Sequence, residues 1–350
     1  MTSSPDVSVI MSVYNVNDNY LKKSIESILN QTYENFEFII IDDCTNQDNI
    51  NTINSYKDNR IVLIRNQVNL GLTKSLNKAI LVSKGKYIAR MDADDISILN
   101  RFEKQVNYLE KNQDTIVVGG LAKVIGRNSI PMSRIENQEV MRMRSIFSNC
   151  IMVHPTAMIN HELLNKYKIS YDESVRKAQD YMFWADCLLN KAKICVLDEV
   201  VLEYRIHEEQ DTNKCSNEQI KCAQKVQRKL LSLLIDNELN EEIMSLHHSI
   251  VQGKINTNIE DYTNHFINLL ESNEIKQVFD VEMFKKECYY MFLMMTVKGI
   301  VHYRDFKGLK SPIFWNAIFK IQYWKYYFDY IVKPIKDEKK VLAKLEDKSN

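Results

Sequence analysis

Short apolar runs alternate with amphipathic stretches along the first part of the chain. Four such runs, rich in β-branched residues, occupy residues 7–15, 36–43, 60–66 and 86–92. Between the first two runs, Leu21, Ile25 and Ile28 recur at helical spacing after Asn19, a good helix N-cap. Residues 76–82 form a second helical pattern, which ends before Gly85. The pattern predicts strands that alternate with helices.

The predicted strands are apolar at consecutive positions, which is typical of strands that helices cover on both faces. We therefore predict an α/β fold with a mainly parallel sheet flanked by helices. Ligands of such sheets bind beyond the carboxyl ends of the strands. Three of the four runs end there in polar or acidic residues, namely Tyr14-Asn15, Asp42-Asp43 and the segment 92–95.

The pattern becomes helical from about residue 215 onward. Leucines cluster at 230–234 and a second apolar group lies at 266–270, whereas no glycine occurs between residues 127 and 252. We predict two domains, residues 1–212 and residues 213–350, of which the second is mainly helical.

The C-terminal region is basic and aromatic. Residues 298–336 contain eight Lys or Arg and two acidic residues, an excess of six positive charges. Five aromatic residues share one predicted helical face: Phe319, Tyr323, Tyr326, Tyr327 and Tyr330. Two interpretations remain open, contact with an anionic membrane surface and the core of a helical domain or of a homo-oligomer interface.

Composition narrows the possible classes of protein. The 350 residues include 46 Lys plus Arg and 46 Asp plus Glu, a balance that argues against nucleic acid as a partner. The seven cysteines are odd in number and contain no CxxC pair, so neither a disulfide framework nor a cysteine zinc site is indicated. With no basic, apolar leader and no apolar run of about 20 residues, we expect a cytoplasmic protein, either free or peripheral on the inner face of the membrane.

The stretch "KYIARMDADD" places Asp92, Asp94 and Asp95 at the end of a predicted strand. Neighbouring carboxylates repel unless a cation or a proton intervenes, and Mg²⁺ and Mn²⁺ prefer oxygen ligands. Alternate residues of an extended segment face the same way, so Asp92 and Asp94 can address one ligand. Two alternatives are a solvated turn that caps a helix near Ile98 and a phosphatase-type nucleophile, which would normally lie on the first strand.

Residues 7–120 resemble the N-terminal half of glycosyltransferase family 2, the inverting sugar-nucleotide enzymes of the GT-A fold. The blocks that match, in the order of the family, are "VSVIMSVYN", "SILNQTYENFEFIIIDD", "NLGLTKSLNKAI", "SKGKYIARMDADD" and "RFEKQV". A looser resemblance continues through "HPTAMI", "AQDYMFW" and "YRIH", so that it covers about 200 residues.

The resemblance implies roles for residues that bind the nucleotide sugar. Val13, Tyr14 and Asn15 would hold the base, although Ser12 stands where many members have proline. Asp43, or alternatively Asp42, would bond to the uracil or its ribose, and Asn69 would lie in a loop near the base.

The resemblance also assigns the carboxylate segment. Asp92, together with Ala93, would contact the ribose side, while Asp94 and His207 would ligate Mn²⁺ or Mg²⁺ at the diphosphate. Arg90 would be either a nucleotide-side cation or a structural ion-pair partner. Asp95 and Arg205 have open roles, as a helix cap and as a partner of phosphate or of a nearby acid.

Asp180 in "AQDYMFW" matches the general base of the family, which takes the proton of the acceptor hydroxyl. The acidic residue that usually precedes it is Gln179 here. Read without the family, Asp180 would be a helix N-cap. Trp184 either packs or lines the acceptor pocket, and His154 is either an acceptor-site residue or a buried histidine.

The resemblance thus implies an inverting glycosyltransferase that moves a sugar from a UDP-sugar donor to a hydroxyl of a glycan or glycolipid acceptor. The product would be capsule, lipopolysaccharide or a lipid-linked oligosaccharide. A non-catalytic subunit that binds the sugar nucleotide is the alternative. A nucleotidyltransferase would need a glycine-rich phosphate loop after the first strand, and "SVYNVNDNYLKKS" contains no glycine.

Overall fold

The structure is a computed structural model that describes residues 4–126, 137–148, 151–207, 217–236, 239–255, 257–303 and 306–319. The chain forms two compact units, which divide between Val226 and Gln227. The predicted domain boundary between residues 212 and 213 lies outside the described residues and stays a prediction. Each unit is described here by itself.

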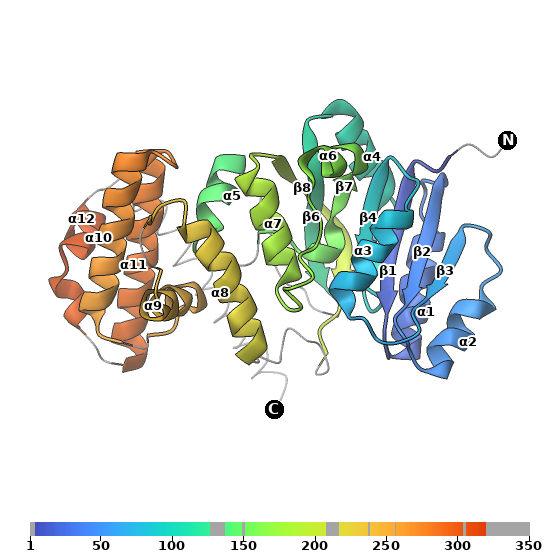
Figure 1. Cartoon of the computed structure of the whole chain (residues 1–350), viewed down its shortest axis with the longest axis horizontal. Helices are drawn as coiled ribbons and strands as arrows, with labels where there is room; N and C mark the ends of the chain where they lie inside the picture. Colours follow the sequence, from blue (N-terminus) through green and yellow to red (C-terminus); the bar gives the residue numbers. More distant parts are fainter. Residues whose placement is uncertain are drawn as a thin grey trace. The chain divides into compact units, whose positions relative to one another are not determined.

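The first unit is built on a mixed, mainly parallel sheet of eight strands in the order β3-β2-β1-β4-β7-β6-β8-β5 (Figure 1). The four predicted strands are confirmed as β1 (Val7–Val13), β2 (Phe36–Asp42), β3 (Ile61–Arg65) and β4 (Tyr87–Met91). These four pair in parallel. The other strands are β5 (Ile96–Ser97), β6 (Thr115–Val124), β7 (Met158–Asn160) and β8 (Lys193–Tyr204).

Helices cover both faces of this sheet, as the continuous apolar strands predicted. One face packs against α1 (Asp18–Leu29), α2 (Gln47–Ser55) and α4 (Arg101–Lys111). The other packs against α3 (Leu72–Val82), α5 (Gln138–Arg144), α6 (His161–Tyr167) and α7 (Gln179–Leu189). In β1, Val9 and Met11 point to the first face and Ile10 to the second, because alternate residues of a strand face opposite ways.

The turn into β4 passes very close to β1. A Cβ atom on Gly85 would lie 2.5 Å from the backbone nitrogen of Ser8, so only glycine fits at this position. The hydroxyl of Ser8 accepts hydrogen bonds from the backbone N–H groups of Lys84 (3.1 Å) and Gly85 (2.8 Å). These contacts hold β4 next to β1 and thereby place the acidic segment that follows β4.

The second unit is helical in its described residues, as predicted. Its helices are the end of α8 (Asn217–Leu231), α9 (Glu241–Gln252), α10 (Ile259–Lys276), α11 (Val281–Tyr303) and α12 (Pro312–Phe319), with a short 3₁₀ turn, η3 (Lys307–Lys310). Tyr262, Phe266, Phe284 and Phe292 form part of its core. None of the described helices is both long and apolar enough to cross a membrane. Most of the predicted aromatic face, beyond Phe319, lies outside the described residues.

Candidate active site at the carboxyl edge of the sheet

Three carboxylates converge after the end of β4. One oxygen from each of Asp92, Asp94 and Asp95 lies within 4.8 Å of the others. Asp95 is fully buried. Its Oδ1 accepts a hydrogen bond from the backbone N–H of Arg205 (2.8 Å), whereas its Oδ2 has no hydrogen-bond partner among the described residues. Burial, and then the charges of Asp92 and Asp94, raise the pKa of Asp95. An oxygen donor set with a buried, unsatisfied carboxylate atom fits a hard divalent cation.

The segment after β8 closes over this cluster. The Nε2 atom of His207 lies 2.9 Å from Oδ2 of Asp94, as expected if both hold one ion. The Nε–H of Arg205 donates to the backbone carbonyl of Asp94 (2.7 Å), and its guanidinium lies 4.0 Å from the ring centroid of Tyr20. Tyr20 was not predicted from the sequence, where a single tyrosine on an amphipathic helix gives no signal. Arg205 therefore fixes the backbone of the acidic segment.

Arg90 lies beneath the carboxylates, not at the surface. Its side chain is buried and forms an ion pair with Asp92, which remains partly exposed. Burial is the largest effect and disfavours the charge of Arg90, but the charge and hydrogen bond of Asp92, with smaller contributions from Tyr171 and Asp95, together outweigh it, so the pKa of Arg90 is raised. The ion pair is the structural pairing that the sequence left open for Arg90.

Asp180 lies in the first turn of α7. The N-cap position is held by Ala178, so Asp180 is not the cap. Its Oδ1 accepts a bond from the backbone N–H of Tyr181 (2.8 Å). Burial raises the pKa of Asp180, against the opposing effects of Tyr181 and Arg90. The charge of Asp180 in turn raises the pKa of Asp92, and the charge of Arg90 lowers the pKa of both carboxylates, so the three groups lie within electrostatic range of one another.

Two neighbouring residues of interest belong to the core. His154 is buried, and its Nε2 lies 2.6 Å from the hydroxyl of Tyr171. Burial lowers the pKa of His154 well below its usual range, so the ring is neutral. Trp184 is fully buried and meets His154 edge to face at 5.8 Å between ring centroids. The sequence left open whether these two residues line an acceptor site or belong to the core. In the structure Trp184 packs in the core and His154 is a buried histidine.

The end of β1 presents a suitable surface for a base. Val13 is buried in the sheet, whereas the ring of Tyr14 is half exposed. Asn15 has a positive φ of 49°, a strained conformation for a residue other than glycine. Its backbone N–H donates to Thr45 Oγ1 (2.7 Å) and its Oδ1 accepts from the N–H of Asn46 (2.9 Å). These bonds fix the turn that carries Tyr14.

Asp43 has a role in the structure that the sequence did not reveal. Its buried carboxylate accepts three bonds of 2.8 Å, from Asn66 Nδ2, from the N–H of Leu70 and from the N–H of Gly71. It therefore shapes the loop that contains Asn69, which is itself exposed. Asp43 and Asn69 thus lie in one hydrogen-bonded unit beside the end of β2.

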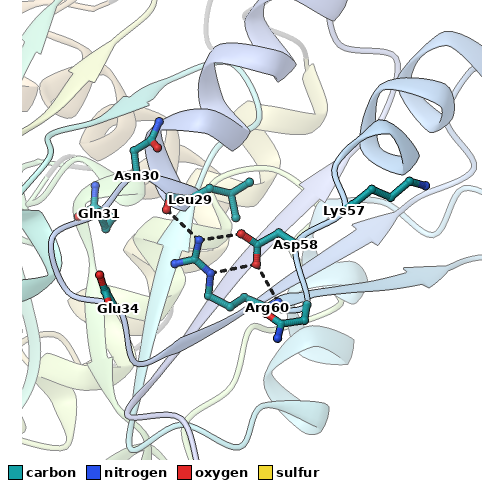
Figure 2. Close-up of a pocket in the computed structure, with 8 residues that line it drawn as sticks. Leu29, Asn30, Gln31, Glu34, Lys57, Asp58 and Arg60 are labelled. Atoms are coloured by element: carbon teal, nitrogen blue, oxygen red, sulfur yellow. Dashed lines mark hydrogen bonds and ion pairs between the residues drawn. The ribbon is translucent and has the colours of Figure 1, made fainter.

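A polar pocket of about 770 Å³ lies at the opposite edge of the sheet (Figure 2). The residues that line it are Leu29, Asn30, Gln31, Glu34, Lys57, Asp58, Asn59 and Arg60. They precede β2 and β3, so the pocket lies at the amino ends of the parallel strands. Arg60 spans it with bonds to Asp58 and to the carbonyl of Leu29. It contains none of the predicted site residues.

Comparison with known proteins identifies the family. The model of the family described as "Glycosyl transferase family 2" matches residues 8–168. An uncharacterized glycosyltransferase of Methanocaldococcus jannaschii is 41% identical over 209 residues, which are 58% of this chain and 71% of that protein. The chain belongs to glycosyltransferase family 2.

Among other relatives, an Escherichia coli protein is named UDP-Glc:alpha-D-GlcNAc-diphosphoundecaprenol beta-1,3-glucosyltransferase WfgD. It is 31% identical over 182 residues, covering 52% of this chain and 69% of that protein. The structure of Staphylococcus aureus TarS 1–349 in complex with UDP-GlcNAc has a TM-score of 0.58 at 16% identity, over 87% of this chain and 89% of that one. A longer TarS structure is matched over 54% of its chain. These likenesses confirm the predicted GT-A fold.

Proposed function

We propose that this family 2 member is an inverting, metal-dependent glycosyltransferase that moves a sugar from a UDP-sugar to a hydroxyl of a glycan acceptor. The observation that carries the proposal is the grouping of Asp92, Asp94, Asp95 and His207 at the same sheet edge as Asp180. The acidic cluster supplies a place for a diphosphate with its cation, and Asp180 supplies a base beside it.

The groups around the end of β1 support the proposal of a UDP-sugar as the donor. The exposed ring of Tyr14 offers a stacking surface for uracil, with Val13 and Asn15 holding it in place. The loop that Asp43 shapes brings Asn69 to the same edge. The name of the E. coli relative specifies a UDP-sugar and TarS was solved with UDP-GlcNAc, which supports UDP as the nucleotide.

Mn²⁺ or Mg²⁺, when bound, would neutralise the negative charge that develops on the departing diphosphate. Asp94 and His207 are suited to hold the ion, and Asp92 with Ala93 would contact the ribose side of the donor. Arg90 and Arg205 hold the acidic segment in place from below and from the side.

Asp180 performs the proton transfer in the proposed reaction. The acceptor oxygen forms a bond to the anomeric carbon as the bond from that carbon to the diphosphate oxygen breaks. The electron pair leaves with UDP, and the proton of the hydroxyl passes to the Asp180 carboxylate. A raised pKa makes Asp180 a stronger base than an ordinary aspartate. One displacement of this kind inverts the anomeric centre.

A relative supports an acceptor of the lipid-linked class. The name of the E. coli relative specifies a sugar linked to diphosphoundecaprenol. We propose that this chain extends a similar acceptor in the synthesis of capsule, lipopolysaccharide or a lipid-linked oligosaccharide, at the inner face of the cell membrane.

The test uses a panel of UDP- and GDP-sugars with Mn²⁺ or Mg²⁺, and measures release of the nucleotide with and without a diphosphate-linked sugar acceptor. Asp94→Ala is expected to abolish metal-dependent binding of the donor. Asp180→Asn is expected to retain binding while transfer falls by about 10²- to 10⁴-fold. Asp114→Asn, at an exposed carboxylate, is the matched control. Donor binding without any turnover in the unmodified chain would favour the non-catalytic subunit instead.

A further inference from the structure

The end of the described chain exposes aromatic side chains to an unusual degree. Four Phe, Trp or Tyr side chains are exposed in the described residues, and three of them, Phe306, Trp315 and Phe319, lie within 14 residues of sequence. Their exposed fractions are 58%, 47% and 74%. The fourth is Tyr14 at the candidate active site. We call residues 306–319 the aromatic segment.

The exposure follows from the pattern of α12. Ile313, Phe314 and Ala317 face inward and are buried in the second unit. Trp315 and Phe319 are one helical turn apart on the other face, and their rings stack with 5.6 Å between centroids. A helix that is apolar on both faces needs a second apolar environment outside its own unit.

The charge of the aromatic segment limits what that environment is. Lys307 and Lys310 are exposed in η3, which packs against α12, and the segment contains no acidic residue. A symmetric contact between two copies would bring these lysines together and raise the free energy of association. An anionic surface attracts them, and each lysine near anionic lipid strengthens binding by about fivefold.

The side chains are those that favour a membrane interface. Tryptophan and other aromatic residues lie at the level of the lipid headgroups, with lysines beside them. The described helices include none that would cross a bilayer, so contact by this segment would be with the surface. We propose that the aromatic segment docks the protein on an anionic lipid bilayer, with Phe306, Trp315 and Phe319 inserted among the headgroups.

Co-sedimentation with vesicles tests this proposal and does not depend on glycosyltransferase activity. The full-length protein is mixed with vesicles of phosphatidylcholine alone or of phosphatidylcholine with phosphatidylglycerol. We expect binding to the second kind only, weakened by added salt. The paired change Trp315→Ser and Phe319→Ser is expected to weaken binding by at least about tenfold. Lys307→Gln and Lys310→Gln are each expected to weaken it by about fivefold.

Ile275→Ser is the matched control, because Ile275 is an apolar residue on α10 of the same unit and is more exposed than Trp315 or Phe319. It is expected to leave vesicle binding unchanged. Tryptophan fluorescence provides a second readout in a Trp324→Phe background. The two tryptophans that remain are Trp184, which is buried, and Trp315, which is exposed. Emission from Trp315 should shift to shorter wavelength when anionic vesicles are added.

Three results would overturn the proposal. The first is equal binding to neutral and anionic vesicles, or to neither. The second is anionic-vesicle binding that survives the paired aromatic change. The third is light scattering that shows a dimer which the paired change converts to a monomer, since the aromatic segment would then be an interface between two copies.

Discussion

Arg90→Met tests whether one buried cation holds the acidic site together. The change removes the charge of Arg90 and keeps an unbranched apolar side chain. The exposed fraction of the Arg90 side chain is 3%, against 31% for its ion-pair partner Asp92. The same charge also favours the ionised forms of Asp95 and Asp180. Methionine would leave these carboxylates without that cation.

The expected loss follows from the burial of the pair. Breaking a buried ion pair by removing one partner costs about 3–5 kcal/mol, because the remaining charge stays desolvated. Water reaches Asp92 and screens part of its charge, so we expect the low end, about 3 kcal/mol of unfolding free energy. Lys193→Met is the control, since its partner Asp114 is 71% exposed and such surface pairs contribute less than about 1 kcal/mol.

Urea unfolding followed by tryptophan fluorescence in a Trp315→Phe and Trp324→Phe background measures the loss, because the remaining tryptophan, Trp184, lies in the core of the first unit. Arg90→Lys should recover part of the stability, as it restores the charge without the planar guanidinium. A loss in Arg90→Met no larger than that in Lys193→Met would refute the reasoning. It would mean that Asp92 is solvated well enough to need no buried partner.

Three further predictions concern other parts of the chain. Asp43→Ala removes the acceptor of three hydrogen bonds in the loop before α3. It should lower the free energy of unfolding by about 3 kcal/mol and weaken UDP binding. Calorimetry that finds an unchanged UDP affinity would contradict this prediction. Burial, and then His247, lower the pKa of His265 to about 3 from 6.5. Between these pH values the unfolded chain binds a proton that the folded unit does not, so the free energy of unfolding falls by about 1.4 kcal/mol for each pH unit that the pH decreases. In His265→Gln, urea unfolding at several pH values should show a weaker dependence of this free energy on pH. An unchanged dependence would exclude His265 as the cause. Gly85→Ala forces a Cβ atom against the backbone of Ser8 and should lower the free energy of unfolding by about 2–3 kcal/mol. An unchanged midpoint of thermal unfolding would show that β4 shifts away from β1 without loss of stability.

The acidic cluster was predictable because its members are neighbours in the chain. Asp92, Asp94 and Asp95 follow a strand within four positions, although the backbone turns at Ala93 and Asp94 and does not stay extended as predicted. His207 was named only through the family resemblance, since 113 residues separate it from Asp94. The stacking of Arg205 on Tyr20 joins two elements far apart in sequence, and no local pattern indicates it.

The sequence by itself predicted β1 to β4 and the helices α1 and α3 that lie between them, because hydrophobic periodicity is a local property. Tertiary structure alone decided which polar groups meet. It turned Asp43 toward its own loop, placed Arg90 beneath the carboxylates and brought Asp180 to the same arginine. Such pairings depend on how the sheet orders its strands, and strand order is set by packing between distant segments, which no single stretch of sequence contains.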